Sequence, residues 1–148
     1  VLACYNSVIP YLCLELPEHQ RQALSASLKA LMVSTNVLIR DWTSFEKLGL
    51  LGVHCPGSYH SDVLLGCPVR FGSYRSPVSP EEPMVVHLYH IPTTPGLSAP
   101  EQFKAGRWSL LTTTFEDFER EIRDQLARML SVGGFDPASD IGAITVNR

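Results

Sequence analysis

The stretch Pro83-Met84-Val85-Val86-His87-Leu88-Tyr89-His90-Ile91 decides the fold, because it is the strongest strand signal in the chain. Apolar, β-branched and aromatic residues dominate it, as in strands that pack against a core. Pro92 ends the run, since proline cannot donate a hydrogen bond to a neighbouring strand. A second strand is predicted at 31–39, so the chain is organised around a sheet.

Helices are predicted before, between and after these two strands in the sequence. Leu16-Pro17-Glu18 is typical of a helix start, because proline suits the first turn and a carboxylate suits its positive end. The predicted helices are 17–30, 42–48, 100–111 and 114–131. The other predicted strands are 1–5, 61–65, 69–74 and 140–147. This order predicts an α+β fold, in which helices cover one face of a mixed, twisted sheet.

The helix predicted at 114–131 carries the clearest signals. Thr113-x-x-Glu116 fits a capping box, and Gly133-Gly134 follows the last turn. Apolar residues recur on one side, at Phe115, Phe118, Ile122, Leu126 and Met129. Oppositely charged residues four apart are predicted to pair on the exposed side: Glu116 with Arg120, Glu119 with Arg123, and Asp124 with Arg128. The helix should therefore pack one face on the sheet.

Composition limits the classes of function. The chain has 148 residues, of which 45% are hydrophobic and 18% charged, which suits one globular domain with a sizeable core. The formal net charge is -3 and no block of Lys or Arg occurs, so a nucleic-acid partner is not expected. Charged and proline residues interrupt every apolar stretch before the roughly 18 residues that a membrane span needs. No membrane span is expected either.

The cysteines give little indication of chemistry. No C-x-x-C pair occurs among the four, which are Cys4, Cys13, Cys55 and Cys67. They are predicted to be buried thiols, because a free cysteine behaves as a small apolar residue. A disulfide or a metal role is the alternative. Free thiols favour a reducing compartment.

Motifs for nucleophilic catalysis and phosphate binding are missing from the sequence. Gly57-Ser58-Tyr59-His60-Ser61 departs from G-x-S-x-G, and His54 and Cys55 would face opposite ways on an extended segment. No G-x-G-x-x-G or G-x-x-x-x-G-K-[ST] occurs, so the chain has no phosphate cradle of its own. His87 and His90 are three positions apart on one strand, which places them on opposite faces and prevents a shared metal ion. We therefore expect neither a catalytic triad nor a metal site.

Both ends of the chain are strand-like. It begins at Val1 without a methionine, and 143–148 is again apolar and β-branched. Natural domains usually end in polar, poorly ordered segments. These ends predict a piece of a longer protein, whose targeting signals would lie outside it. A cytoplasmic location is favoured, with a periplasmic one as the alternative.

Several segments resemble one family of flavoproteins. Val1-Leu2-Ala3-Cys4-Tyr5-Asn6 resembles the strand that closes the flavin-binding domain of flavin-containing amine oxidoreductases, and 9–17 resembles the exit that follows. More distinctive similarity to bacterial spermidine dehydrogenase-like FAD-dependent proteins lies in Tyr59, Tyr74-Arg75, 79–83, 122–130, 134–137 and 143–148. The resemblance implies that 1–7 closes the FAD-binding domain and that 8–148 is the substrate-binding domain.

The resemblance also implies a function for the longer protein. It would oxidise an amine of the polyamine type by hydride transfer to FAD, whereas this piece alone would be inactive and would bind no FAD. Its partners would be the amine and the remainder of the FAD-binding domain, with a second copy of the chain left open. The residues implied near the flavin are Ala3, Cys4, Tyr5 and Asn6.

Candidate amine-binding residues occur on turn-linked strands, where a scaffold often presents binding groups. They are Tyr59, Asp62, Tyr74, His87 and Tyr89. Aromatic rings attract an ammonium group, and apolar surroundings favour the neutral amine that hydride transfer needs. Each candidate also has a structural interpretation, the tyrosines as core residues and Asp62 as a turn residue. The alternative function is a non-catalytic ligand-binding or interaction module, whose parent would lack an upstream G-x-G-x-x-G.

Overall fold

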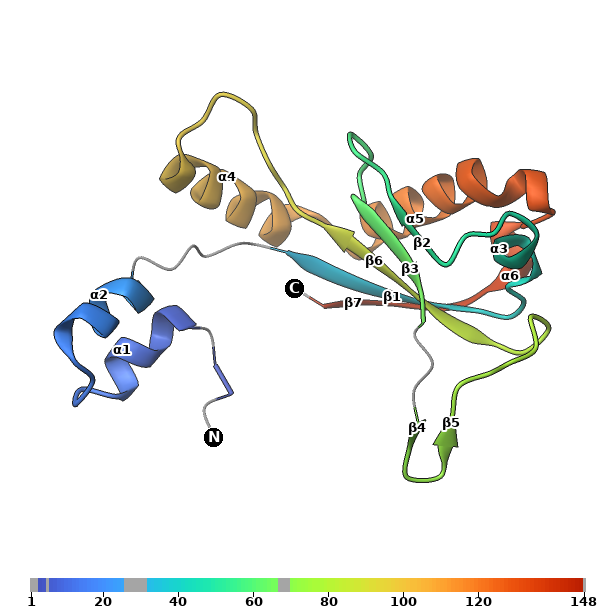
Figure 1. Ribbon diagram of the computed structural model, residues 1–148. Helices are drawn as coiled ribbons and strands as arrows, with labels where there is room; N and C mark the ends of the chain where they lie inside the picture. Colours follow the sequence, from blue (N-terminus) through green and yellow to red (C-terminus); the bar gives the residue numbers. More distant parts are fainter. Residues whose placement is uncertain (1–2, 5, 26–31, 67–69, 148) are drawn as a thin grey trace. The chain divides into compact units, whose positions relative to one another are not determined.

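The structure separates the chain into two parts. The computed structural model describes residues 3–4, 6–25, 32–66 and 70–147 (Figure 1). Two compact units result, Val1–Leu31 and Met32–Arg148, and each is described by itself. This division lies further along the chain than the boundary after residue 7 that the family resemblance implies.

The first unit is helical in its described part. Its elements are η1 (Asn6–Val8), a 3-10 helix, followed by α1 (Ile9–Leu12) and α2 (Glu18–Ser25). The strand predicted at 1–5 is wrong for Ala3 and Cys4, which belong to no strand, while residues 1, 2 and 5 lie outside the described residues. A lone strand leaves its backbone groups unpaired, whereas Pro10 in the first turn of α1 favours a helix. Within the helix predicted at 17–30, α2 is confirmed and 26–30 lies outside the described residues.

The second unit contains a five-stranded sheet. Its strands, in spatial order, are β2 (Gly52–His54), β3 (Asp62–Leu65), β6 (Met84–His90), β1 (Val33–Ile39) and β7 (Ile141–Asn147). The α+β class and the strand predicted at 84–91 are confirmed, and β6 lies at the centre of the sheet. Every pairing among these strands is antiparallel, so the sheet that was expected to be mixed has no parallel pair in the described residues. The short strand β2 was not predicted from the sequence.

A separate hairpin interrupts the sequence between β3 and β6. The single strand predicted at 69–74 is wrong, because β4 (Arg70–Phe71) and β5 (Tyr74–Arg75) are two short antiparallel strands. The turn between them contains Gly72, whose φ of 58° is readily adopted by glycine. Tyr74 therefore lies on a hairpin that forms its own two-stranded sheet.

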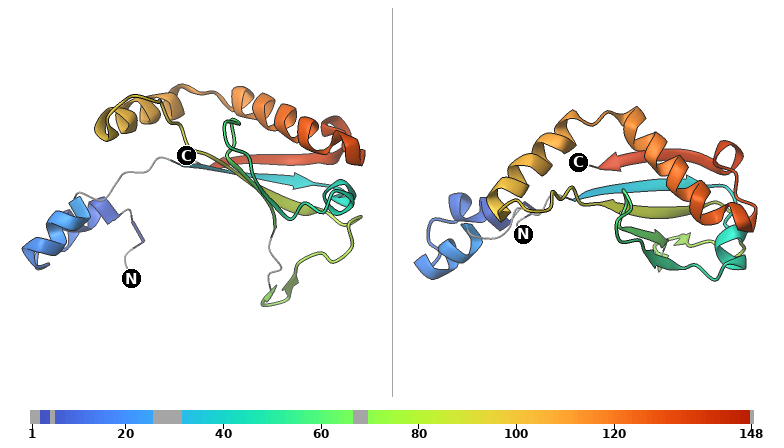
Figure 2. Two further views of the ribbon diagram at one scale, coloured as in Figure 1. Left: turned by 45° about the horizontal axis from the view of Figure 1, so that its top comes forward. Right: turned by 90° about the horizontal axis from the view of Figure 1, so that it is seen from above.

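Helices of the second unit lie on one side and at one end of the five-stranded sheet. The elements are α3 (Thr43–Lys47), α4 (Ala99–Thr112), α5 (Phe115–Leu130), η2 (Ser131–Gly133) and α6 (Pro137–Asp140). Helix α5 lies across the sheet, and α4 continues on the same side toward the end where β6 finishes (Figure 2). None of the helices in the described part of the chain is long and apolar enough to cross a membrane.

The core lies between α5 and the sheet. Phe118, Ile122, Leu126 and Leu130 of α5 are fully buried, and each contributes roughly 1.5–3 kcal/mol through removal of apolar surface from water. Alternate residues of the two central strands are buried on the same side: Val33, Thr35, Val37, Ile39, Met84, Val86, Leu88 and His90. The remaining residues of β1 and β6 consequently point to the opposite face.

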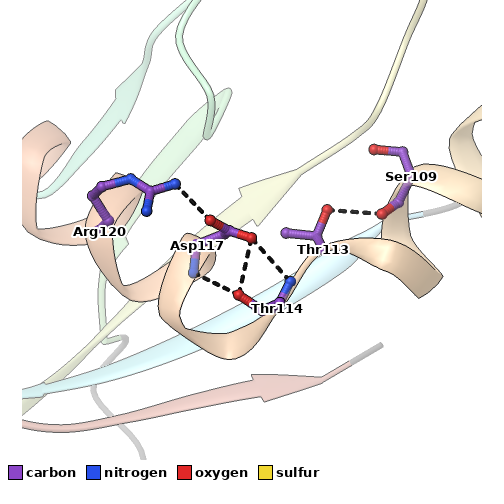
Figure 3. Close-up of polar contacts among 5 residues, drawn as sticks. All are labelled: Ser109, Thr113, Thr114, Asp117 and Arg120. Atoms are coloured by element: carbon purple, nitrogen blue, oxygen red, sulfur yellow. Dashed lines mark hydrogen bonds and ion pairs between the residues drawn. The ribbon is translucent and has the colours of Figure 1, made fainter.

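The N-terminus of α5 begins one residue later than predicted. The capping box is formed by Thr114 and Asp117, not by Thr113 and Glu116 (Figure 3). The Thr113 hydroxyl instead donates to the carbonyl of Ser109 at 2.7 Å and so completes the end of α4. The consecutive residues Thr113 and Thr114 thus complete the end of α4 and the start of α5.

The cap also changes one predicted ion pair. Arg120 pairs with Asp117, with 2.6 Å between Nη2 and Oδ1, instead of with Glu116. The other two predicted pairs are confirmed, Arg123 with Glu119 at 2.8 Å and Arg128 with Asp124 at 3.0 Å. All three are at least partly exposed, so each contributes little to stability.

Gly133 is expected to be a sensitive position. A Cβ added there would lie 2.9 Å from Cα and Cβ of Ser44, because η2 passes close to the α3 backbone. We expect Gly133→Ala to lower the free energy of unfolding by about 1–3 kcal/mol, which is typical of overpacking. Urea denaturation of the variant measures this change.

Gly142→Ala is the matched control. A Cβ at that position would meet side-chain atoms of Arg40 and Leu38 at 3.6 Å, which is ordinary van der Waals contact. Equal losses of stability in the two variants would contradict the proposed close approach.

Candidate functional site

The face of the sheet turned away from α5, called the open face below, carries a row of polar side chains. Strand pairing places His54 opposite Asp62, Asp62 opposite Tyr89, and Tyr89 opposite Ser34. Ser34 in turn lies opposite Asn147, so the row crosses all five strands. Directly paired residues have Cβ atoms about 4.5–5.5 Å apart, which brings their side chains into contact range.

Asp62 is the acidic group of this row, and it is held ionised. Its Oδ2 accepts a hydrogen bond of 2.6 Å from the Ser61 hydroxyl, and its Oδ1 lies 3.0 Å from Nδ1 of His54. These two contacts lower the pKa of the Asp62 carboxyl, the Ser61 bond being the larger cause. The Asp62 side chain is 36% exposed, so a negative charge is available to solvent beside the ring of Tyr89.

His87 lies on the open face two residues before Tyr89. Its Nδ1 is 2.6 Å from Oδ1 of Asn36, the residue opposite it on β1. Because an amide oxygen only accepts, Nδ1 of His87 is the donor in this contact. The open face therefore combines a carboxylate, an aromatic ring and an oriented imidazole.

Three of the five predicted amine-binding residues, Asp62, His87 and Tyr89, are brought together in this way. Tyr59 is not with them. Its ring stacks on His90 at a centroid distance of 4.0 Å and an interplanar angle of 4°, on the side covered by α5. His87 and His90 point to opposite faces, as predicted. The backbone of Tyr74 belongs to the separate hairpin.

The residues implied near a flavin belong to the other unit. Ala3 and Cys4 are exposed, Asn6 begins η1, and Tyr5 lies outside the described residues. The cysteines also differ from expectation, because Cys4 is exposed and Cys13 and Cys55 are half-buried free thiols. Cys67 lies outside the described residues. No cluster of three or more metal-ligating side chains occurs among the residues that the structure describes.

A buried contact that the sequence did not reveal connects α5 to the turn before β3. The Gln125 amide accepts from the backbone N–H of His60 at 3.0 Å and donates to the His60 carbonyl at 2.8 Å. Gln125 is only 2% exposed and lies between the buried residues Ile122 and Leu126. A polar residue within an apolar helix stripe was the signal that could have indicated this contact.

Burial keeps two histidines near this contact, His60 and His90, neutral. Burial lowers the pKa of His60 to about 4, although a hydrogen bond to Gln125 opposes the shift. Nε2 of His60 has no hydrogen-bond partner within the described part of the chain. Burial also lowers the pKa of His90, against the hydrogen bond to the Tyr59 carbonyl and the charge of Glu121. At neutral pH these rings pack in the core, and each donates a hydrogen bond through Nδ1, His60 to the Gln125 amide oxygen and His90 to the Tyr59 carbonyl.

Comparison of the sequence with models of known protein families and with curated proteins finds no match.

The lowered pKa of His60 predicts acid sensitivity. Below pH 6.5 the unfolded chain takes up a proton at this residue, whereas the folded chain resists protonation until about pH 4. The free energy of unfolding should therefore be highest above pH 6.5 and should fall by up to about 3 kcal/mol between pH 6.5 and 4. Chemical denaturation across this pH range measures the loss.

His60→Phe should flatten this pH profile, leaving the smaller slope that the lowered pKa of His90 contributes. His54→Gln is the control, because the His54 side chain is 68% exposed. The explanation fails if His60→Phe and the unchanged chain lose stability in parallel as the pH falls.

Proposed function

We propose that this chain is the substrate-side part of an FAD-dependent amine oxidoreductase, and that the open face of its sheet forms a wall of the amine site. The proposal joins the family resemblance of the sequence to one structural observation. That observation is the cross-strand pair of Asp62 and Tyr89, which sets an ionised carboxylate beside an aromatic ring on a face that α5 does not cover.

This pair has the chemistry of an organic ammonium site. A carboxylate supplies the opposite charge, and an aromatic ring within about 6 Å of a cation adds roughly 0.5–2 kcal/mol of attraction. A flexible di- or polyamine has a remote charged nitrogen that needs such a contact while the reacting nitrogen is desolvated. Asp62 would hold the remote ammonium, and Tyr89 would cover its alkyl chain.

The described residues do not fit the flavin itself. The sequence has no G-x-G-x-x-G, and the residues implied near the cofactor form no strand where the structure describes them. We therefore assign no flavin contact to this chain. FAD, which would accept the hydride, would instead be bound by the remainder of the longer protein.

A second candidate function is a non-catalytic interaction module. The observation that favours it is the apolar surface of α4, where Trp108 is 70% and Leu111 is 61% exposed. Lys104 and Arg107 lie on the same helix. Exposed Trp and Arg side chains are frequent at protein interfaces. An amine titration separates the two candidates, because only the first requires an ammonium site.

Asp62→Asn tests the amine site in the complete protein. Removing an interaction that acts equally on the bound substrate and the transition state raises KM and leaves kcat nearly unchanged. We expect KM for di- and polyamines to rise about tenfold, the effect of losing one charge-assisted contact. Steady-state kinetics at constant flavin content measure both constants.

Asp124→Asn makes the same change of charge at an exposed position of α5 and is the control. An unchanged KM in the Asp62→Asn variant, or an equal increase in both variants, would place the amine site elsewhere.

The second expected outcome concerns the cofactor. The complete protein should be yellow and contain one flavin, whereas the 148-residue chain should be colourless, because it lacks a phosphate-binding loop. Absorbance of flavin released by denaturation measures the stoichiometry. Stoichiometric flavin retained by the chain alone would overturn the proposed division of roles.

A further inference from the structure

A concave site lies on the side of the sheet that α5 covers, at the end of β6. Its volume is about 430 Å³, which is within the range of small-molecule sites. The turn before β3, the loop after β6 and helix α4 surround it. Among its walls are Tyr59, His90, Ser58, Thr93, Ala105 and Ser109.

The walls of this pocket carry hydroxyl groups but no ionic side chain. Serine and threonine residues come from all three surrounding segments, and no Asp, Glu, Lys or Arg occurs among its described lining residues. Pro92 and Ala105 add apolar surface. The pocket therefore differs from the open face, where Asp62 supplies a negative charge.

His90 is a polar group of this pocket whose ring is held by a hydrogen bond and by stacking on Tyr59. Its Nδ1 lies 2.5 Å from the Tyr59 carbonyl oxygen, and because a carbonyl only accepts, Nδ1 carries the proton. One face of the imidazole is covered by the Tyr59 ring. The neutral ring is thus left with Nε2 as its remaining polar atom, a lone-pair acceptor on the opposite edge from the Tyr59 carbonyl contact.

The surroundings of His90 select against a cation. Burial lowers the pKa of this imidazole against the opposing charge of Glu121, and the same loss of solvent would penalise a charged ligand beside it. An acceptor nitrogen near the apolar surface of Pro92 and Ala105 instead complements a flat, neutral molecule with one donor group. Hydroxyls at the rim would satisfy its further polar atoms.

We propose that this pocket binds an uncharged aromatic ligand that donates an O–H or N–H hydrogen bond to Nε2 of His90. The site is separate from the amine site proposed on the open face. Asp62 does not line this pocket, so failure of the amine proposal would not remove it.

Phenol is the probe, because it is neutral at pH 7.5 and has a single hydroxyl donor. Anisole has a similar size and no donor, and benzylammonium carries a charge. Two-dimensional NMR of the histidine ring nitrogens in the 148-residue chain reports binding at His90 directly. We expect saturable phenol binding with a shift of the His90 Nε2 signal, and binding of anisole and benzylammonium at least about fivefold weaker.

Three variants locate the effect. His90→Phe keeps an aromatic ring in the stack but removes the acceptor, and it should weaken phenol binding about fivefold or more. Ala105→Leu adds bulk to the α4 wall without altering His90, and it should also weaken phenol binding. This variant tests whether phenol occupies the pocket even if His90→Phe does not fold. His87→Phe, on the open face, should leave phenol binding unchanged.

Absence of saturable phenol binding at millimolar concentration would overturn the proposal. Equal affinity for phenol and anisole would overturn the role of His90. Unchanged phenol binding in Ala105→Leu would show that the ligand does not occupy this pocket.

Discussion

The antiparallel pairing of β6 with β1 and β3 is the constraint on which both proposed sites depend. Side chains alternate along β6, so His90 and Leu88 enter the covered side while Tyr89 and His87 enter the open face. Pairing with β3 then places Asp62 beside Tyr89. A slip of one residue would exchange the two sets of side chains, and the buried surface of Val86 and Leu88 opposes such a slip.

The two faces consequently offer opposite electrostatic environments only a few residues apart in sequence. On the open face, hydrogen bonds from Ser61 and His54 stabilise the charged form of Asp62. On the covered side, loss of solvent stabilises the neutral form of His90. If the two proposed sites bind these ligands, desolvation would distinguish a protonated amine on the open face from an uncharged donor on the covered side.

Strong periodicity made the central elements predictable from the sequence. The strand at 84–90, the helix at 115–130 and the opposite orientation of His87 and His90 follow from the spacing of apolar residues. Placing Asp62 beside Tyr89 was beyond such reasoning, because their pairing joins strands that are distant in sequence. Local competition explains other errors. Thr113 and Thr114 are both capable caps, and the hydrogen bond from Thr113 to Ser109 decides between them.

The contact between Gln125 and His60 explains how one helix supports both faces. The Gln125 amide forms hydrogen bonds with the backbone N–H and carbonyl of His60, which lies in the turn before β3. These are the backbone groups that a neighbouring strand would otherwise pair with. Tyr59 precedes this residue and holds His90, while Ser61 follows it and donates to Asp62. Fixing the backbone of His60 therefore fixes the neighbours that orient a group in each site. The buried polar pair joins the turn to α5, and it therefore links the attachment of α5 to the backbone position of His60.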